Sequence, residues 1–302
     1  MGNTPIIRLS DKIVKGDMAD ILVKFEGVNV GGSIKTRTAY NMIKAAEERG
    51  DIDKDTVIVE PTSGNQGIGL ALIGAVEGYK VRIIMPDSVS EERRKLIQAY
   101  GAELVLIHDE GDIGECIYRC LRTALQMANE DPKVWVPEQF SNKDNPQVHR
   151  SQTGAEILAQ VDGPIDGFCS GIGTGGTLTG VGETLRAANP DIHIMAVEPE
   201  NAAILSGGEI GSHLQMGIGD GLIPKNLNQE IFDDICIISD KDAIQTTQRL
   251  MRDEGIMCGI SSGSNVAAAI RLARKLGKGK TVVTILPDTA ERYYSTPLFE
   301  FE

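Results

Sequence analysis

Short runs of β-branched residues alternate with helix-length segments along most of the 302 residues, and this alternation constrains the fold more than any other feature. The strand-like runs are apolar throughout, as expected where helices cover both faces of a parallel sheet. Predicted strands are residues 56–60, 80–85, 103–107, 167–170, 192–198 and 281–286, and predicted helices are 67–78, 91–100, 113–129, 177–188, 240–254 and 265–276. The pattern predicts an α/β fold, and the Pro- and Asn-rich stretch 137–146 is the best candidate for a boundary between two lobes.

Composition excludes several classes of function. The net charge of −13 disfavours nucleic-acid binding, because contact with phosphates needs a basic face. No run of 18 apolar residues and no signal peptide is found, so we expect neither a membrane span nor secretion. Whether residues are missing upstream of Met1 stays an open question. Five cysteines without a CxxC pair and four scattered histidines are typical of a reduced, cytoplasmic protein without a metal site.

The turn from Gly171 to Thr177 follows a predicted strand and opens a predicted helix. It fits the GxGxxG pattern of dinucleotide-binding folds, and Glu198 ends the next predicted strand, where a ribose-binding acid would lie. Its glycines and the hydroxyls of Thr174 and Thr177 also suit a phosphate dianion, because backbone N–H groups at a helix N-terminus attract anions. Three interpretations of this turn therefore stay open: a nicotinamide site, a phosphate site, and a turn that serves only packing.

A second turn, from Gly259 to Gly263, matches the GxSxG nucleophile elbow of hydrolases through Ser261. That fold places its histidine after the serine, and no histidine follows His213. The hydrolase interpretation fails on this count. What remains is a hydroxyl at the mouth of a sheet, or a helix N-cap.

A third turn runs from Pro61 to Gly67 between a predicted strand and a predicted helix. Its polar side chains and two glycines could hold an anion, and a carboxylate is a natural ligand there. An ordinary capped turn explains the same residues equally well.

One lysine has unusual neighbours. Lys35 begins a helical stretch that runs to Arg49, after two glycines and beside the apolar Ile34. Most lysines are solvated surface charges, but a partly desolvated lysine near a phosphate can lose its proton and attack a carbonyl.

Taken together, the motifs resemble those of the cysteine synthase (O-acetylserine sulfhydrylase) and cystathionine β-synthase family, the fold-type II pyridoxal-phosphate (PLP) enzymes. The resemblance covers essentially the whole chain, with the motifs in the family's order. They are GGSIKTR around Lys35, PTSGNQG at 61–67, GTGGT at 173–177, GIGDGLIP at 217–224 and GISSG around Ser261.

The resemblance implies a role for each matching position. Lys35 would hold PLP as a Schiff base and later move the α-proton, Asn65 would meet the phenolic oxygen of the cofactor, and Ser261 the pyridine nitrogen. The residues that would bind the phosphate are Gly173, Thr174, Gly175, Gly176 and Thr177. Those that would contact the substrate are Thr62, Ser63, Gly64, Gln66, Gln139 and Gly217.

The resemblance also implies an architecture. Each of two lobes would be a largely parallel twisted sheet flanked by helices. Residues 36–140 would form a smaller, mobile lobe with the substrate loop, and residues 1–35 plus 141–302 the larger PLP-binding lobe. The active site would lie between them, in a homodimer that acts on a small amino acid.

Three positions depart from the family pattern. Thr36 replaces a frequent Asp, with no consequence that we can derive, and Gln66 replaces a Thr but still offers an amide donor. Asp220 replaces a small apolar residue near the substrate side chain. An exposed loop aspartate is one interpretation. The other is a general base that activates water or a thiol and repels bisulfide, which would favour sulfide release from cysteine.

Several functions therefore stay open. The leading one is PLP-dependent β-replacement, with release of hydrogen sulfide from cysteine and synthesis of cysteine from O-acetylserine as its two directions. The nearest alternative is a related enzyme that forms lanthionine, cystathionine or diaminopropionate. A nicotinamide reductase and a non-enzymatic regulatory partner lie outside this class.

Overall fold

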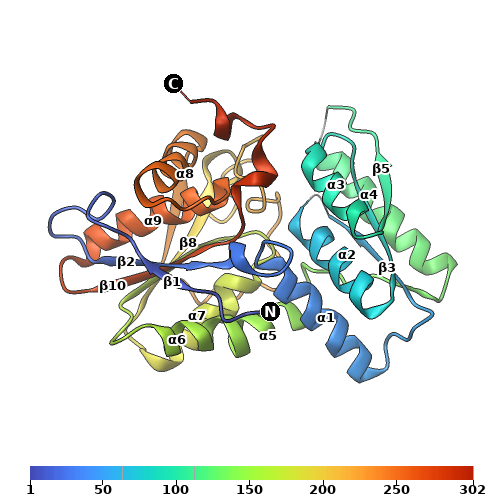
Figure 1. Cartoon of the computed structure of the whole chain (residues 1–302), viewed down its shortest axis with the longest axis horizontal. Helices are drawn as coiled ribbons and strands as arrows, with labels where there is room; N and C mark the ends of the chain where they lie inside the picture. The colour runs from blue at the N-terminus through green and yellow to red at the C-terminus, as the bar shows by residue number, and fades with distance from the viewer. Residues whose placement is uncertain (63, 112, 302) are drawn as a thin grey trace.

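Two sheets organise the computed structural model of the chain, which describes residues 1–62, 64–111 and 113–301. The smaller sheet has its four strands in the order β5 (Glu103–Ile107), β4 (Lys80–Pro86), β3 (Val57–Pro61) and β6 (Val134–Trp135). All neighbouring strands in it are parallel. This sheet and its helices form the unit on the right of Figure 1.

The larger sheet combines strands from both ends of the chain. Its order is β1 (Ile6–Arg8), β2 (Asp20–Phe25), β10 (Thr281–Leu286), β7 (Gly167–Gly171), β8 (His193–Pro199) and β9 (Asp234–Ile238). Only β1 is antiparallel to its neighbour. The predicted fold of two largely parallel sheets flanked by helices is confirmed.

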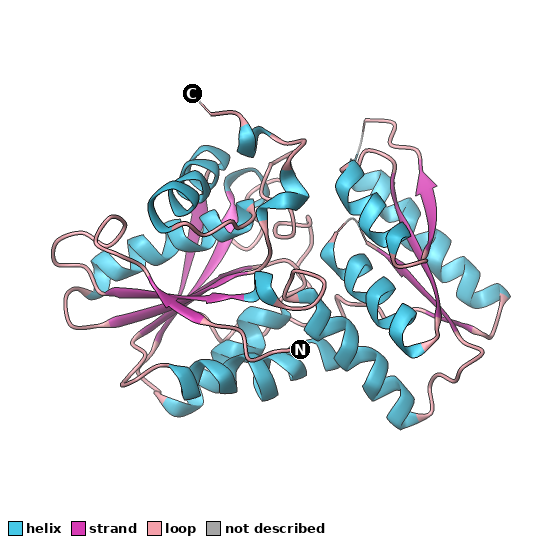
Figure 2. Ribbon diagram, in the orientation of Figure 1, coloured by secondary structure: helices cyan, strands magenta, loops and turns pink. Residues whose placement is uncertain are grey.

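Helices cover both faces of each sheet, as Figure 2 shows. On the smaller sheet, one face packs on α1 (Lys35–Arg49), α2 (Asn65–Glu77) and α3 (Glu91–Ala99), and the other on α4 (Ile113–Glu130). On the larger sheet, one face packs on α8 (Asp240–Glu254) and α9 (Ile260–Leu276), and the other on α6 (Ala155–Gln160) and α7 (Gly176–Ala188). The remaining helical segments are α5 (Asp144–Val148), the π-helical turn His149–Gly154, and the 3-10 turns Glu26–Val28, Glu200–Ala202, Ala290–Tyr293 and Pro297–Phe299.

A buried charge network holds the start of α1 against the larger sheet. Arg37 is fully buried, and its guanidinium donates to Glu26 at 2.7 Å and to Glu156 at 2.7 Å. Lys24, on β2, donates to the same Glu156 at 2.7 Å. The four groups carry two positive and two negative charges, so each buried charge has an opposite partner.

Within the described residues, the cysteines at 116, 120, 169, 236 and 258 are free and buried. No described histidine, cysteine and carboxylate side chains gather in a group of three or more that could hold a metal ion. No helix in the described part of the chain has the length and apolar character needed to cross a membrane.

Candidate active site

A cavity of about 400 Å³ opens between the two units. It lies at the carboxyl ends of β3 and β7, which is where ligands bind in open parallel sheets. The predicted site residues that line it are Lys35, Thr62, Gly64, Asn65, Gln66, Gln139, Gly173, Thr174, Gly175, Thr177, Gly217, Asp220 and Ser261. Gly176 is buried and is not among the lining residues, and Ser63 lies outside the described residues.

Two glycines of the turn between β7 and α7 have no room for a side chain. A Cβ atom on Gly173 would lie 2.3 Å from the carbonyl oxygen of Gly217, and one on Gly176 would lie 2.1 Å from Oδ1 of Asn145. Asn145 in turn donates to Oγ1 of Thr174 at 2.9 Å. Glycine is therefore required at both positions of this turn, which lies at the N-terminus of α7, where free backbone N–H groups attract a phosphate.

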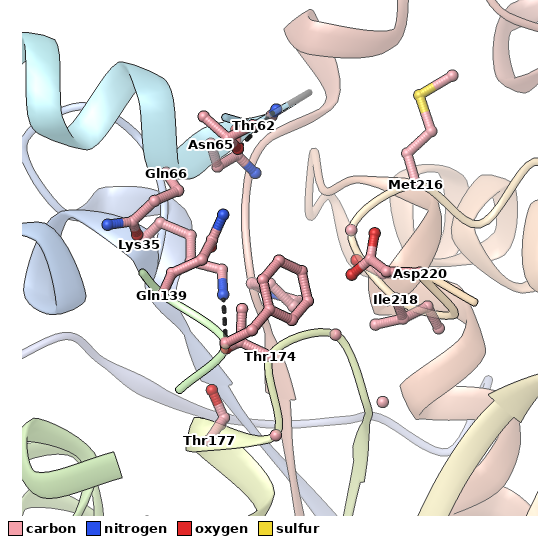
Figure 3. Close-up of a pocket in the computed structure, with 18 of the residues that line it drawn as sticks. Lys35, Thr62, Asn65, Gln66, Gln139, Thr174, Thr177, Met216, Ile218 and Asp220 are labelled. Carbon is pink, nitrogen blue, oxygen red and sulfur yellow. Dashed lines mark hydrogen bonds between the residues drawn. The ribbon is translucent and has the colours of Figure 1, made fainter. Parts of the chain in front are cut away.

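Lys35 points at this turn from the first residue of α1. Its Nζ donates to Oγ1 of Thr174 at 3.2 Å, as the dashed line in Figure 3 shows. The side chain keeps some contact with solvent through the cavity, but protein surrounds it, and burial lowers its pKa to about 8. The carboxylates of Asp220 and Glu60 oppose that shift. Part of the Lys35 population is then a neutral amine near neutral pH, as a nucleophile requires.

The turn after β3 presents amide groups to the cavity. Gln66 is 1% exposed, and neither its Nε2 nor its Oε1 has a partner within the described structure. Oδ1 of the neighbouring Asn65 is also without a partner there, while its Nδ2 donates to Asp288 at 2.6 Å. Buried polar atoms are nearly always paired, so these amides are arranged for a ligand.

Asp220 faces Lys35 from the other wall of the cavity (Figure 3). Its loop is held by a hydrogen bond from the N–H of Gly219 to the carbonyl of Ile172 at 2.9 Å, and by contact between Nε2 of His213 and the carbonyl of Gly219 at 3.0 Å. Gly219 has φ +70°, a conformation that favours glycine. Burial raises the pKa of Asp220, and the positive charge of Lys35 opposes the shift. An exposed loop aspartate is thus not what the fold places here.

Two predictions from the motifs need correction. Helix α9 begins at Ile260, five residues before the predicted start, so Ser261 lies in its first turn and is 3% exposed. The carboxylate of Glu198, the expected ribose-binding acid, instead accepts from the N–H groups of Leu205 at 2.8 Å and Ser206 at 3.2 Å. Glu198 therefore stabilises a turn.

Sequence reasoning missed three acidic residues of the cavity wall, Glu60, Glu138 and Asp288. Glu60 accepts from the backbone N–H groups of Glu138 and Gln139, both at 3.1 Å, and burial raises its pKa to about 8. A glutamate near the end of an otherwise apolar strand was the available signal for Glu60.

Residues 1–288 match the family described as pyridoxal-phosphate dependent enzymes. The chain therefore belongs to the pyridoxal-phosphate-dependent enzymes. It is 48% identical, over 303 aligned residues, to the cysteine synthase of Staphylococcus aureus strain Mu50, a match that covers all of this chain and 96% of that protein. Within the family, the chain is an enzyme of the cysteine synthase type.

Solved structures with the same fold have several named activities. A crystal structure of O-ureido-L-serine synthase matches with a TM-score of 0.93 and 41% identity, over 99% of this chain and 93% of that one. A hydrogen sulfide-producing enzyme from Fusobacterium nucleatum matches with a TM-score of 0.90 and 40% identity, over 97% of each chain. This similarity indicates the class of reaction but does not distinguish among the possible substrates.

The cavity fits the PLP that this family uses. It combines a lysine of lowered pKa, a glycine turn that admits no Cβ at two positions, and buried amide atoms that have no hydrogen-bond partner in the described structure. These groups suit an aldehyde, a phosphate and the polar edge of a ring, respectively.

Proposed function

We propose that the chain releases hydrogen sulfide from L-cysteine, by adding water at the β-carbon to give serine. One observation carries the proposal: a carboxylate, that of Asp220, lies in the cavity wall across from Lys35. The similarity to a hydrogen sulfide-producing enzyme from Fusobacterium nucleatum supports the same direction.

The remaining residues of the cavity hold the reactants. Thr62, Gln66 and Gln139 bind the substrate carboxylate through their hydroxyl and amide groups. The turn at 173–177 binds the phosphate, and Ser261 meets the ring nitrogen. When bound, the cofactor supplies the electron sink that lets the bond at the β-carbon break.

Two groups move protons. Lys35, as a neutral amine, takes the α-proton of the amino acid and returns it to the α-carbon after the water oxygen has bonded to the β-carbon. The bond between the β-carbon and sulfur breaks and HS⁻ leaves. Asp220 then takes a proton from water while the water oxygen bonds to the β-carbon, and that proton passes to HS⁻. The sum is cysteine plus water to serine plus hydrogen sulfide. The negative charge of Asp220 also repels returning HS⁻.

Synthesis of cysteine from O-acetylserine and sulfide is the second candidate. The 48% identity to a cysteine synthase along the whole chain favours it. Incubation with cysteine alone, and separately with O-acetylserine plus sulfide, followed by identification of the products, compares the two directions. A chain that makes cysteine but releases no sulfide from it contradicts the first proposal.

Asp220→Asn is expected to lower sulfide release from cysteine by about a hundredfold or more, because an amide cannot take the proton of water. The measurement is the initial rate of hydrogen sulfide formation with cysteine as the sole substrate. Asp191→Asn is the matched control, because Asp191 precedes β8 at its end away from the cavity. If sulfide release survives in Asp220→Asn, Asp220 is not the base.

Cofactor uptake by the apoenzyme is expected to accelerate as the pH rises through about 8, because only the neutral Lys35 amine attacks an aldehyde. Asp220→Asn should move this midpoint to lower pH, since the carboxylate raises the pKa of Lys35. Stopped-flow measurement of the visible absorption across a pH series reports both. A midpoint near 10.5, the ordinary value for lysine, speaks against a desolvated amine.

The proposal includes a division of the chain. Residues 36–140 form the smaller lobe, which closes on the substrate, and residues 1–35 plus 141–302 form the larger lobe. The strands of the four-stranded sheet all lie within 36–140, which supports this division. A homodimer in the cytoplasm is proposed with it, from the family resemblance.

A further inference from the structure

The segment Pro287–Asp288 joins three parts of the cavity. It follows β10, and the carbonyl of Pro287 accepts from the N–H of Ile34 at 2.8 Å, one residue before Lys35. Ser33 and Asp288 form an isolated antiparallel bridge. The carbonyl of Asp288 accepts from the N–H of Gly259 at 3.4 Å, at the start of α9. The backbone of this segment thus sets the start of α1 against the start of α9.

The side chain of Asp288 reaches across to the third part, α2. Its Oδ2 accepts from Nδ2 of Asn65 at 2.6 Å, a contact between residues 223 positions apart in the chain. The hydroxyl of Tyr293 donates to the same oxygen at 2.7 Å. Asp288 is 1% exposed, and Tyr293 is fully buried. The carboxyl group therefore has a fixed place between the two units.

This contact determines which way the amide of Asn65 points. Oδ2 of Asp288 accepts from both Asn65 and Tyr293, so the nitrogen of Asn65 faces this oxygen and the amide oxygen faces away. One N–H of that nitrogen is used by Asp288. The other N–H remains for a ligand in the cavity, and a flip of the amide would place two oxygen acceptors against each other.

The surroundings keep Asp288 in place. A Cβ atom on Gly259 would lie 2.2 Å from Oδ1 of Asp288, so glycine at 259 leaves the room that the carboxyl group occupies. On the other side, the guanidinium of Arg93 lies 5.2 Å from the centre of the Tyr293 ring. Arg93 also donates to the sulfur of Met216 at 3.2 Å. Arg93, from the smaller unit, thus packs on Tyr293, and Tyr293 donates to Asp288.

We infer that Asp288 is a positioning residue, which fixes the orientation of the Asn65 amide and its place relative to Lys35 and Ser261. The inference rests on the proposed role of Asn65 in binding the cofactor. Asp288 acts as a hydrogen-bond acceptor of fixed position and not as an acid or base.

The test is a double-mutant cycle between Asp288→Ala and Asn65→Ala in the holoenzyme. In the native background, Asp288→Ala is expected to lower kcat/KM for sulfide release about tenfold to a hundredfold, because the amide is no longer held. In the Asn65→Ala background, it should lower kcat/KM by less than about twofold, since there is no amide left to hold. The absorption maximum of the bound cofactor should shift in the same direction in both single variants.

Conservative variants separate position from charge. Asp288→Asn can present its oxygen to Asn65 and Tyr293, so it should recover most of the loss seen in Asp288→Ala. Tyr293→Phe removes one donor and should give a smaller loss, again only in the native background; it replaces Asp288→Ala in the cycle if that variant does not fold. Asp166→Ala is the control, because Asp166 accepts from the N–H of Thr281 at 2.9 Å at the far end of β10 and should leave the cofactor spectrum unchanged.

Each contrary outcome has its own meaning. If Asp288→Ala causes the same loss in both backgrounds, or if Asp288→Asn is as poor as Asp288→Ala, the positioning role is wrong while the proposed role of Asn65 stands. If Asn65→Ala alone changes neither the spectrum nor the kinetics, the role of Asn65 is wrong, and the inference fails with it.

Discussion

Lys35→Ala is expected to yield a protein without the visible absorption of bound cofactor and with turnover reduced at least about a thousandfold. Lys35 Nζ lies within hydrogen-bond distance of Thr174 in the glycine turn, at 3.2 Å. Burial lowers its pKa to about 8, so part of it is a neutral amine near neutral pH, as the proposed roles of nucleophile and base require. The measurements are the absorption spectrum after incubation with excess cofactor and the rate of sulfide release.

Lys225 provides the control for that experiment. It also lines the cavity, but its side chain is exposed. Lys225→Ala should therefore keep the visible absorption and most of the activity. If the Lys35→Ala protein still gains the absorption of covalently bound cofactor, another amine binds the cofactor, and the proposed site is wrong.

Arg37→Met is expected to reduce the free energy of unfolding by about 3–5 kcal/mol, because it leaves the buried carboxylate of Glu26 without its cation. Glu26 is fully buried, and Arg37 donates to it at 2.7 Å and 3.0 Å. Since Arg37 lies two residues after Lys35, the start of α1 should also loosen, and cofactor affinity should fall with stability. Urea unfolding followed by circular dichroism measures the first effect.

Arg8→Met is the matched control for Arg37→Met. Arg8 donates to Asp20 at 2.6 Å, but the two side chains are 67% and 44% exposed. Removing this pair should cost less than about 1 kcal/mol, because water solvates both charges once they separate. Adding Glu26→Gln to Arg37→Met should restore part of the lost stability. A loss no larger than that of Arg8→Met contradicts the importance of the buried network.

Apolar runs with clear boundaries were sufficient to predict most of the fold. Strand β5 and helix α8 have the bounds that the sequence predicts, because each pattern is regular and ends in a turn. Strand β2 was missed because Asp20 and Lys24 interrupt its apolar pattern, and the buried charge network compensates Lys24 in a way that only the fold reveals. Strand β6 has two residues, too few for any pattern.

The site was predictable where its chemistry is local. Lys35 and the turn at 173–177 are recognisable within a few neighbouring residues, and the fold brings them together from 139 positions apart. Asp288 was missed as a site residue because its partner Asn65 lies in a different unit of the fold. Glu60 was missed for a similar reason, since the N–H groups that donate hydrogen bonds to it belong to residues 78 and 79 positions away. Long-range partners of this kind leave no signature in one sequence.

The place of β10 has a consequence for the order in which the protein is built. Strand β10 lies between β2 and β7 in the larger sheet, so this sheet lacks an inner strand until residues 281–286 leave the ribosome. The four strands of the smaller sheet are complete by residue 135. During synthesis the smaller unit can therefore fold first. One edge of β2 stays without its neighbouring strand until more than 250 further residues have been synthesised. Asp288 emerges just after β10, so this part of the cavity wall is added only after all the other strands of both sheets have been made.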